Sequence, residues 1–195
     1  MADERIEDIS GGELTAVASG DLFVVLDVSD TTDDGDGTTK YISYQNLNAY
    51  GSITVEDNAT ETTISGTQTD FGANAVQVVT FGANGVALNT TPDHTNDHIT
   101  IDVAGVYQIA LSMSFSGEAN DTYSFAIFKN NKATQLGTRA TRVIGSGGDV
   151  GSASLVAMAS LDVNDTIEVW IQNEDGVTNF NCTVEDASLT VFRVG

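Results

Sequence analysis

The chain has 195 residues, with 28 acidic side chains against 7 basic ones and a formal net charge of -21 at pH 7. This excess argues against nucleic-acid binding, because contact with a phosphate backbone relies on Lys and Arg to release its counterions. Three readings of the acidity stay open: solubility at high salt, repulsion that keeps free copies apart before they dock on a scaffold, and cation binding.

The composition predicts an all-β protein. Glycine occurs 19 times, proline once, and only 18% of the residues are charged, while Ser, Thr, Asn, Val and Ala are common. This mixture favours strands and turns over helices. The length fits one domain with an appendage or two small domains.

Neither the cysteine content nor the hydropathy indicates an oxidised or membrane-bound protein. Cys182 is the single cysteine, so no intrachain disulfide can form, and its strand parity with Phe180 and Val184 predicts a small buried apolar residue. The N-terminal residues contain no apolar signal-peptide core, and no run of 18 apolar residues occurs. We expect a soluble protein without a secretion signal or a membrane partner.

Residues 1–50 are predicted to form a small docking arm. Apolar strands are expected at residues 22–28 and 40–47, separated by the polar loop 29–39. Their apolar mass is too small for independent folding, so such a segment needs a partner surface. The apolar residues expected to serve docking are Ile6, Ile9, Leu14, Leu22, Phe23, Val25, Ile42 and Leu47.

The loop at residues 30–37 has the carboxylates of a calcium loop but not the spacing. If Asp36 and Gly37 supply positions five and six of an EF-hand loop, position twelve is Ser43. If Asp34 and Gly35 supply them instead, position twelve is Tyr41. Both registers lack the bidentate Glu. Because Asp-Gly is also a strong turn signal, we interpret the segment as a solvated hairpin loop.

Residues 51–75 are rich in Thr, Ser, Gly, Asn and Asp and are interpreted as a linker leading into the first strands of the main domain, residues 76–195. Regular strand signals follow, separated by turn signals, a spacing typical of a sandwich or a jelly roll. The expected strands are residues 76–81, 85–88, 98–103, 105–117, 123–129, 133–137, 141–144, 151–161, 166–172, 177–184 and 188–194.

The strand at residues 105–117 organises the predicted fold. Apolar side chains recur at every second position, which is the period of a strand with one buried face. A helix would scatter them around its cylinder. The predicted core residues are Tyr107, Ile109, Leu111, Met113 and Phe115.

Two strands are apolar on both faces and therefore need two covers. In residues 151–161, Val156 and Met158 lie opposite the face of Leu155, and in residues 123–129 Phe128 lies opposite Phe125. In a two-layer sandwich the second cover comes from another chain, from a loop or from the first 60 residues. Oligomerisation is the commonest of these, so Phe128, Val156 and Met158 are candidate contact residues.

Three segments resemble successive strands of the C1q and tumour-necrosis-factor-like jelly roll: residues 99–109 with Gly105-Val106-Tyr107, residues 123–131 ending in Asn130-Asn131, and residues 161–169 with Leu161-Asp162-Val163-Asn164-Asp165. The resemblance spans roughly residues 76–194. It implies an antiparallel sandwich of ten short strands and a tight homotrimer with an apolar face of each subunit around the axis. Asn164 stands where the family often has Gly, a change that Asn tolerates at positive φ.

The first 50 residues resemble the amino-terminal segments of bacteriophage virion proteins, through Ile9, Leu14, the run 20–27 and the run 40–47. Joined to a trimeric jelly roll, this resemblance implies a capsid decoration protein or short head fibre on the virion surface. The implied partners are two further copies and the major capsid protein or another virion component. The alternative is a tail-associated protein that binds a receptor or glycan through Trp170, Tyr123 and Tyr107, although core packing would also explain these aromatics.

No catalytic motif or cofactor is predicted. The sequence contains no nucleophile elbow, no phosphate loop and no Cys with a nearby His, so we do not expect an enzyme. His94 and His98 are weak metal candidates, because their four-residue spacing suits a helix whereas Pro92 and the following strand indicate a turn. A symmetry axis could still gather copies of one His or Asp around a cation.

Overall fold

The structure, a computed structural model, describes residues 22–27, 38–43, 48–64, 70–78, 80–146, 149–175 and 180–195. The chain divides into two compact units, residues 1–47 and 48–195. All regular structure in the described ranges is β-strand. No helix in these ranges has the length and apolar character needed to cross a membrane.

The first unit contains an antiparallel pair, β1 (Leu22–Asp27) and β2 (Thr38–Ser43), with Phe23 opposite Ile42 and Leu22 opposite Ser43. This pairing confirms that the two predicted strands are antiparallel partners, and the loop 30–37 predicted between them lies outside the described residues. Four of the docking-arm residues, Ile6, Ile9, Leu14 and Leu47, lie outside the described residues.

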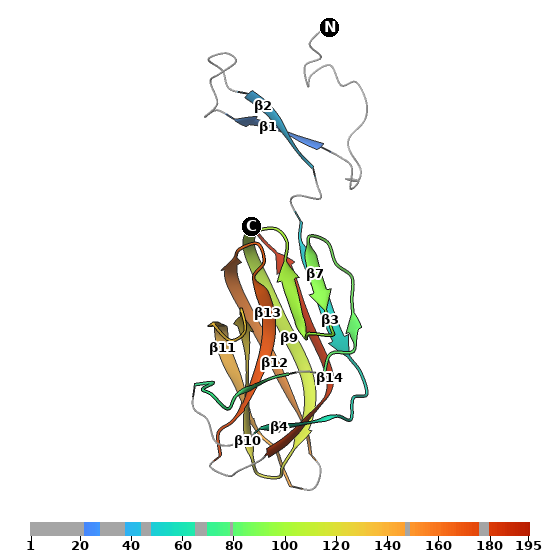
Figure 1. Cartoon of the computed structure of the whole chain (residues 1–195), viewed down its shortest axis with the longest axis vertical. Helices are drawn as coiled ribbons and strands as arrows, with labels where there is room; N and C mark the ends of the chain where they lie inside the picture. The colour runs from blue at the N-terminus through green and yellow to red at the C-terminus, as the bar shows by residue number, and fades with distance from the viewer. Residues whose placement is uncertain are drawn as a thin grey trace. The chain divides into compact units, whose positions relative to one another are not determined.

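The second unit consists of two antiparallel sheets (Figure 1). In the first sheet the order is β11 (Thr134–Val143), β10 (Thr122–Lys129), β13 (Thr166–Asn173), β8 (His98–Ile101) and β7 (Thr90–Asp93), with β5 (Val76–Gln77) on β13. In the second it is β12 (Val150–Leu161), β9 (Gly105–Gly117), β14 (Phe180–Arg193), β3 (Tyr50–Val55) and β6 (Ala83–Asn84), with β4 (Glu61–Ile64) on β14.

The core lies between the sheets, and the inward residues of β9 form its centre. Tyr107, Ile109, Leu111, Met113 and Phe115 are all buried, as predicted. Burying one such side chain contributes about 1.5–3 kcal/mol, so this strand alone supplies a large share of the stability.

Aromatic contacts tie the two sheets together inside the core. The ring of Phe115 meets those of Phe125 and Tyr123 edge to face, at centroid distances of 4.6 and 5.9 Å. Cys182 is fully buried, as expected, and burial raises the pKa of its thiol to about 12. The thiol is therefore protonated at neutral pH and acts as a small apolar side chain.

Two stretches of the segment 51–75, predicted as a linker, belong to the second sheet as β3 and β4. Strand β3 pairs with β14, with Ile53 opposite Leu189, and β4 pairs with β14 further along. Both Ile53 and Ile64 are fully buried. The prediction was wrong here because the isolated isoleucines, set among Thr and Ser, gave no alternation long enough to indicate a strand.

Several predicted strand boundaries also change. The described residues of the predicted strands 177–184 and 188–194 fall in one strand, β14, whose register shifts between Val184 and Asp186, and residues 177–179 lie outside the described ranges. Residues 133–137 and 141–144 likewise belong to β11, which passes through Gly137 at a φ of 70°. Each of these two predicted breaks is an irregularity within a continuous strand.

The edge strand β7 was missed, and the short strands before it are shorter than expected. Pro92 lies in β7, opposite Ile99, and this position is allowed because β7 is the last strand of its sheet. Of the predicted strand 76–81 the described residues keep only the two-residue strand β5, and of 85–88 only a single bridge at Leu88, while the two-residue strand β6 lies between the two predicted ranges. Asn164 takes a φ of 71°, as its place in the resemblance required.

Candidate interaction surface

The outward residues of β12, β9, β14 and β3 form one surface, called here the outer face. Along each of these strands, outward-facing residues alternate with core residues. The strand register fixes which outward-facing residues are neighbours across the sheet. Met158, Gln108, Phe192 and Tyr50 follow one another in one row, and Val156, Ala110, Thr190 and Ser52 in the next. The surface is therefore defined by four adjacent strands of one rigid sheet.

One half of the outer face, called the apolar half, exposes large apolar side chains. Val156 and Met158 are each 63% exposed and Phe192 is 51% exposed. Val106 and Val194 stand beside them, and the backbone of Val194 donates to Val106 at 2.8 Å. Contiguous exposed apolar side chains of this kind mark an interaction site in a soluble protein. The structure thus confirms that β12 is apolar on both faces, and none of the described residues covers the outer one.

A shallow apolar groove lies at the β3 edge of the apolar half. Its cavity volume is about 220 Å³, and its lining includes Tyr50, Val86 and Phe192. Val86 is 77% exposed, the largest exposure of any large apolar residue described. The remaining lining residues are Gly51, Ser52, Thr190 and Val191. None of the described residues that line it is charged.

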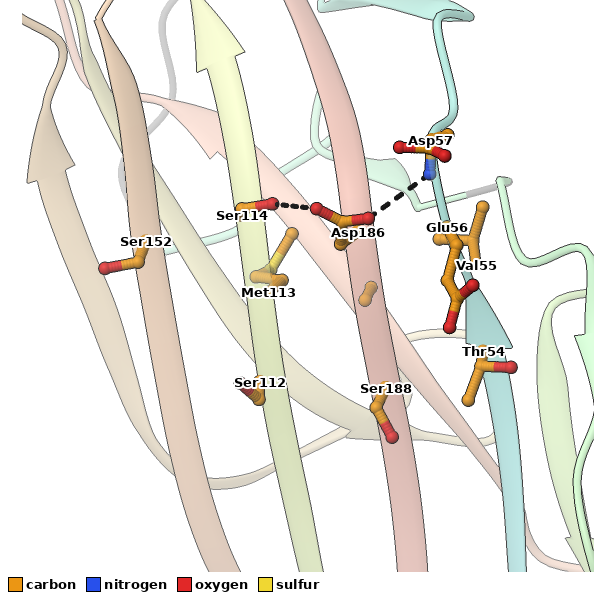
Figure 2. Close-up of a pocket in the computed structure, with 11 residues that line it drawn as sticks. Thr54, Val55, Glu56, Asp57, Ser112, Met113, Ser114, Ser152, Asp186 and Ser188 are labelled. Carbon is orange, nitrogen blue, oxygen red and sulfur yellow. Dashed lines mark hydrogen bonds between the residues drawn. The ribbon is translucent and has the colours of Figure 1, made fainter.

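The other half, called the acidic half, is polar and hollowed. Serines cover the middle, and a hollow of about 600 Å³ opens beside Glu56, Asp57 and Asp186 (Figure 2). Asp186 accepts hydrogen bonds from the Ser114 hydroxyl at 2.9 Å and the Asp57 backbone amide at 3.2 Å. The adjoining hollow of about 670 Å³ adds Glu61 and Glu185. No Lys or Arg occurs among the residues that line these two hollows.

The outer side of the first sheet is covered by its own chain. Residues 70–75, called the covering segment, lie against β10 and β13, with the ring of Phe71 5.2 Å from that of Phe128. Phe128 is 5% exposed and also meets Trp170. The sequence allowed three possible covers for Phe128, namely another chain, a loop or the first 60 residues. The structure shows that a loop covers it. The expectation that Phe128 points to oligomerisation was wrong.

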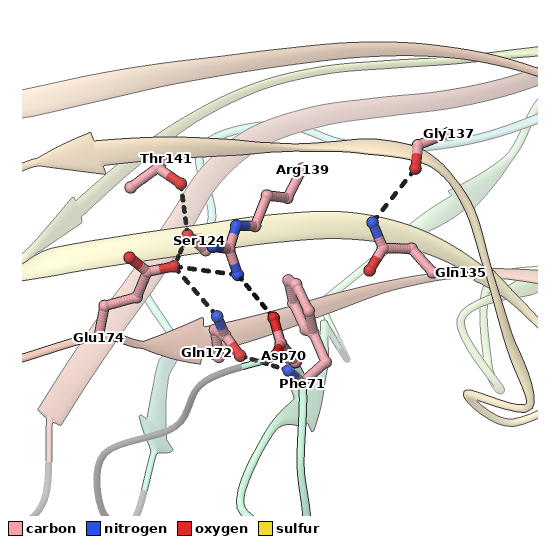
Figure 3. A network of polar contacts seen from close by, with 9 residues as sticks. All are labelled: Asp70, Phe71, Ser124, Gln135, Gly137, Arg139, Thr141, Gln172 and Glu174. Carbon is pink, nitrogen blue, oxygen red and sulfur yellow. Dashed lines mark hydrogen bonds and ion pairs between the residues drawn. The ribbon is translucent and has the colours of Figure 1, made fainter.

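Polar contacts hold the covering segment in place (Figure 3). The Phe71 amide donates to the side-chain oxygen of the buried Gln172 at 2.6 Å. Arg139 lies 3.5 Å from both Asp70 and Glu174, which joins the segment to β11 and β13. On its other side, Lys132 donates to the Gly72 carbonyl at 2.7 Å and stands over the Trp170 ring. Sequence reasoning missed this segment, because one Phe among small polar residues carries no strand or helix period.

The two histidines lie at the turn between β7 and β8 and serve local hydrogen bonds. His94 Nδ1 is 3.0 Å from Asn84 Oδ1, and His98 Nδ1 is 3.1 Å from the Asn96 carbonyl. Asp93 accepts from Asn96, and these hydrogen bonds lower the pKa of its carboxyl group. Within the described ranges, no group of three or more His, Cys, Asp or Glu side chains is arranged to hold a metal ion.

The three aromatic residues considered for glycan binding are engaged elsewhere. Tyr107 and Tyr123 are fully buried, and their hydroxyls donate to the carbonyls of Val103 and Asn181. Trp170 is partly buried, and its indole N–H donates to Glu168 at 2.9 Å while Lys132 stands over its ring. None of these three offers an open aromatic face for a sugar.

Neither a family profile nor a curated protein matches the sequence. Among solved structures, Eiger TNF from S. frugiperda superposes with a TM-score of 0.51 at 14% identity, over 76% of this chain and 92% of that one. Murine APRIL follows with a TM-score of 0.49 at 12% identity, over 75% of this chain and 99% of that one.

The globular domain of the zebrafish complement 1qA protein is also similar, with a TM-score of 0.45 at 17% identity, over 75% of this chain and 98% of that one. Sequence identities this low support a conclusion about the fold alone. That conclusion rests on the similarity to Eiger TNF. The chain has the all-β, C1q/TNF-like jelly-roll fold that its sequence resemblance predicted.

Proposed function

We propose that this protein is a structural component of a bacteriophage virion, a capsid decoration protein or short head fibre. Three copies associate through the apolar halves of their outer faces, and residues 1–47 attach the assembly to the capsid. The protein stabilises the particle or presents the jelly roll from it. The function is mechanical and requires no chemistry at the surface.

The uncovered apolar half is the observation that carries this proposal. Covering Val156, Met158 and Phe192, which are more than half exposed, would contribute about 1.5–3 kcal/mol for each side chain fully removed from water. The described part of the chain provides a cover for the first sheet but none for this face. The resemblance to the C1q/TNF-like family supports a homotrimer as the arrangement that covers it.

The division of the chain supports the docking role of the first unit. Residues 1–47 form a unit of their own, and the second unit has a complete core without them. Such a unit is available for a different partner than the jelly roll's own copies. The resemblance of residues 20–27 and 40–47 to virion-protein segments indicates a capsid surface as that partner.

A truncation separates the two parts of the proposal. A chain of residues 48–195 should be soluble and trimeric by sedimentation but should no longer bind particles that lack the protein, whereas the full chain decorates them. If the truncated chain decorates the particles fully, the docking role of residues 1–47 is wrong. If the full chain is a monomer at every concentration, the self-association is wrong.

A further inference from the structure

We propose that the outer side of the first sheet carries a peptide-binding pocket, which the covering segment occupies in cis. The pocket takes an aromatic side chain that is preceded by an acidic residue and followed by glycine, as in Asp70-Phe71-Gly72. A partner protein that exposes an extended segment of this kind displaces the covering segment. Neither residues 1–47 nor the outer face takes part, so the inference goes beyond the proposed function and is independent of it.

The pocket is built by residues of the sheet and not by the segment that fills it. Ala126, Phe128 and Trp170 form its apolar wall. Beside this wall the side-chain oxygen of the fully buried Gln172 accepts the Phe71 amide at 2.6 Å, and no other described residue donates to it. A buried oxygen of this kind requires a donor. Apolar walls with one convergent polar group are the usual composition of a site for an aromatic side chain.

Two cations beside the pocket favour an acidic segment. Arg139 lies 3.5 Å from Asp70 and is held by Glu174 at the same distance (Figure 3). Lys132 donates to the Gly72 carbonyl at 2.7 Å. In a chain with 7 basic residues against 28 acidic ones, two basic side chains around one short segment are a local concentration of positive charge. Exposed pairs of this kind contribute more to specificity than to affinity. They select an acidic partner segment over a basic one.

An internal repeat shows that the pocket imposes the backbone strain of the covering segment. Residues 71–76 read Phe-Gly-Ala-Asn-Ala-Val, and residues 81–86 read Phe-Gly-Ala-Asn-Gly-Val. Phe71 has a φ of 51°, whereas the φ of Phe81 is not positive. Phe81 packs in the main core, and its amide donates to Asp97 at 2.8 Å. Nearly the same sequence is thus free of this strain elsewhere, so leaving the pocket relieves it.

The covering segment can open without disturbing the sandwich. Its apolar contacts form a cluster of their own, separate from the main core. The strands beneath it, β10 and β13, are paired along their length and need no support from it. Segments with few buried apolar contacts open locally at a lower free energy than the core. Local opening therefore presents an intact pocket to a partner.

A peptide added in trans tests the pocket. Full-length Phe71→Ala lacks the ring that fills it, and the emission of Trp170, the single tryptophan of the chain, reports whether the pocket is occupied. The probe is a synthetic peptide with the sequence of residues 70–76. We expect saturable binding that returns the emission toward the wild-type wavelength. The matched peptide with alanine in place of Phe71 should bind about tenfold more weakly. A peptide with lysine in place of Asp70 should bind severalfold more weakly.

Three results of this titration overturn the inference. They are the absence of saturable binding, equal binding of the alanine peptide, and an emission maximum of Phe71→Ala that already equals that of the wild type, because the pocket then stays covered. Where Phe71→Ala does not fold, Phe71→Leu replaces it, with the same peptides and the same expected order of affinities.

Hydrogen exchange in the wild-type protein tests whether the cover opens. The Phe71 amide should exchange at least about a hundredfold faster than the Ile109 amide in the core strand β9, because local opening costs less than global unfolding. Exchange of the Phe71 amide only through global unfolding overturns the inference, since no partner can then enter. Neither result bears on self-association or particle binding, which the truncation at residue 48 judges separately.

Discussion

At the scale of single residues, Asp165 holds together the turn between β12 and β13. Its carboxylate lies 2.9 Å from Lys129 Nζ and accepts from Asn130 at 2.6 Å and from the Asp162 amide at 3.0 Å. Burial acts to raise the pKa of this carboxyl group, but the hydrogen bonds from Asp162, Lys129 and Asn130 outweigh it and lower the pKa. The folded state therefore favours the ionised form.

Replacing this carboxylate should cost stability in a pH-dependent way. Asp165→Asn is expected to reduce the free energy of unfolding by about 1–3 kcal/mol at pH 7, because the Lys129 ammonium loses its charged partner. Since the folded pKa lies below the unfolded value of about 3.9, the difference is full above pH 4 and disappears as pH falls through the folded pKa. Urea titrations of the wild-type protein and the variant between neutral and acid pH measure this difference in the free energy of unfolding. A difference that does not change with pH would contradict the ionic role of Asp165.

Gly137 is a second residue with a defined requirement. Its φ is 70°, and a Cβ there would lie 3.0 Å from Ala157 Cβ on β12. Gly137→Ala should destabilise the protein by about 1–3 kcal/mol through backbone strain and crowding. Gly82→Ala is the control, because a Cβ there meets nothing closer than 4.0 Å and should change stability by less than about 1 kcal/mol. Equal thermal midpoints for the two variants would refute the requirement.

At the scale of elements, the covering segment stores strain that its packing offsets. Asp70 and Phe71 both have positive φ, 57° and 51°, a conformation that costs about 1–3 kcal/mol per residue. The buried ring of Phe71 and the hydrogen bond from its amide to Gln172 balance that cost. The segment is thus held by a small number of contacts.

Removing the Phe71 ring should release this segment. Phe71→Ala is expected to lower the free energy of unfolding by up to about 3 kcal/mol and to expose Trp170, the single tryptophan of the chain. Its fluorescence emission should shift to longer wavelength. Lys132→Met keeps the apolar stem over Trp170 and should cost only about 0.5–1 kcal/mol. Unchanged emission in Phe71→Ala would mean that other contacts hold the segment.

The sequence predicted those strands in which apolar and polar residues alternate over many positions. Strand β9 shows five apolar residues at alternate positions, so its existence, its inward face and its central place all followed from the pattern. Strands β3 and β7 were missed or misread, because Ile53 stands alone and Pro92 reads as a strand breaker. Strand β3 pairs with β14, a partner distant in sequence that local propensity does not report, whereas β7 forms a hairpin with the next strand, β8.

The candidate surface was predictable only in part. Val156 and Met158 were identifiable, since both faces of β12 are apolar and one face must lack a cover within the sandwich. The same reasoning applied to Phe128 was wrong, because a single Phe71 from a polar segment covers it. The groove was not predictable at all: Val86 approaches Tyr50 and Phe192 only once β3 and β14 are paired.

At the scale of the whole molecule, charge and apolar burial should act on the proposed self-association in opposite directions. Raising NaCl from about 0.02 M to about 0.5 M should strengthen self-association, because salt screens repulsion between chains of charge -21. Val156→Ser with Met158→Ser should weaken it at every salt concentration, since less apolar surface is covered. Analytical ultracentrifugation measures both effects. Weaker association at high salt would indicate that ion pairs, not apolar contacts, join the copies.

Both ends of the jelly roll's chain lie at one pole. The Arg193 amide donates to the Ala49 carbonyl at 2.8 Å, and the Val106 amide donates to the Gly195 carbonyl at 2.7 Å. The exposed turn 118–121 follows β9 and stands roughly 40 Å away, at the far end of that 13-residue strand. A foreign peptide fused after Gly195 would emerge beside the joint with the first unit. One inserted into the turn would be presented at the opposite tip, which makes that turn the better site for engineered display.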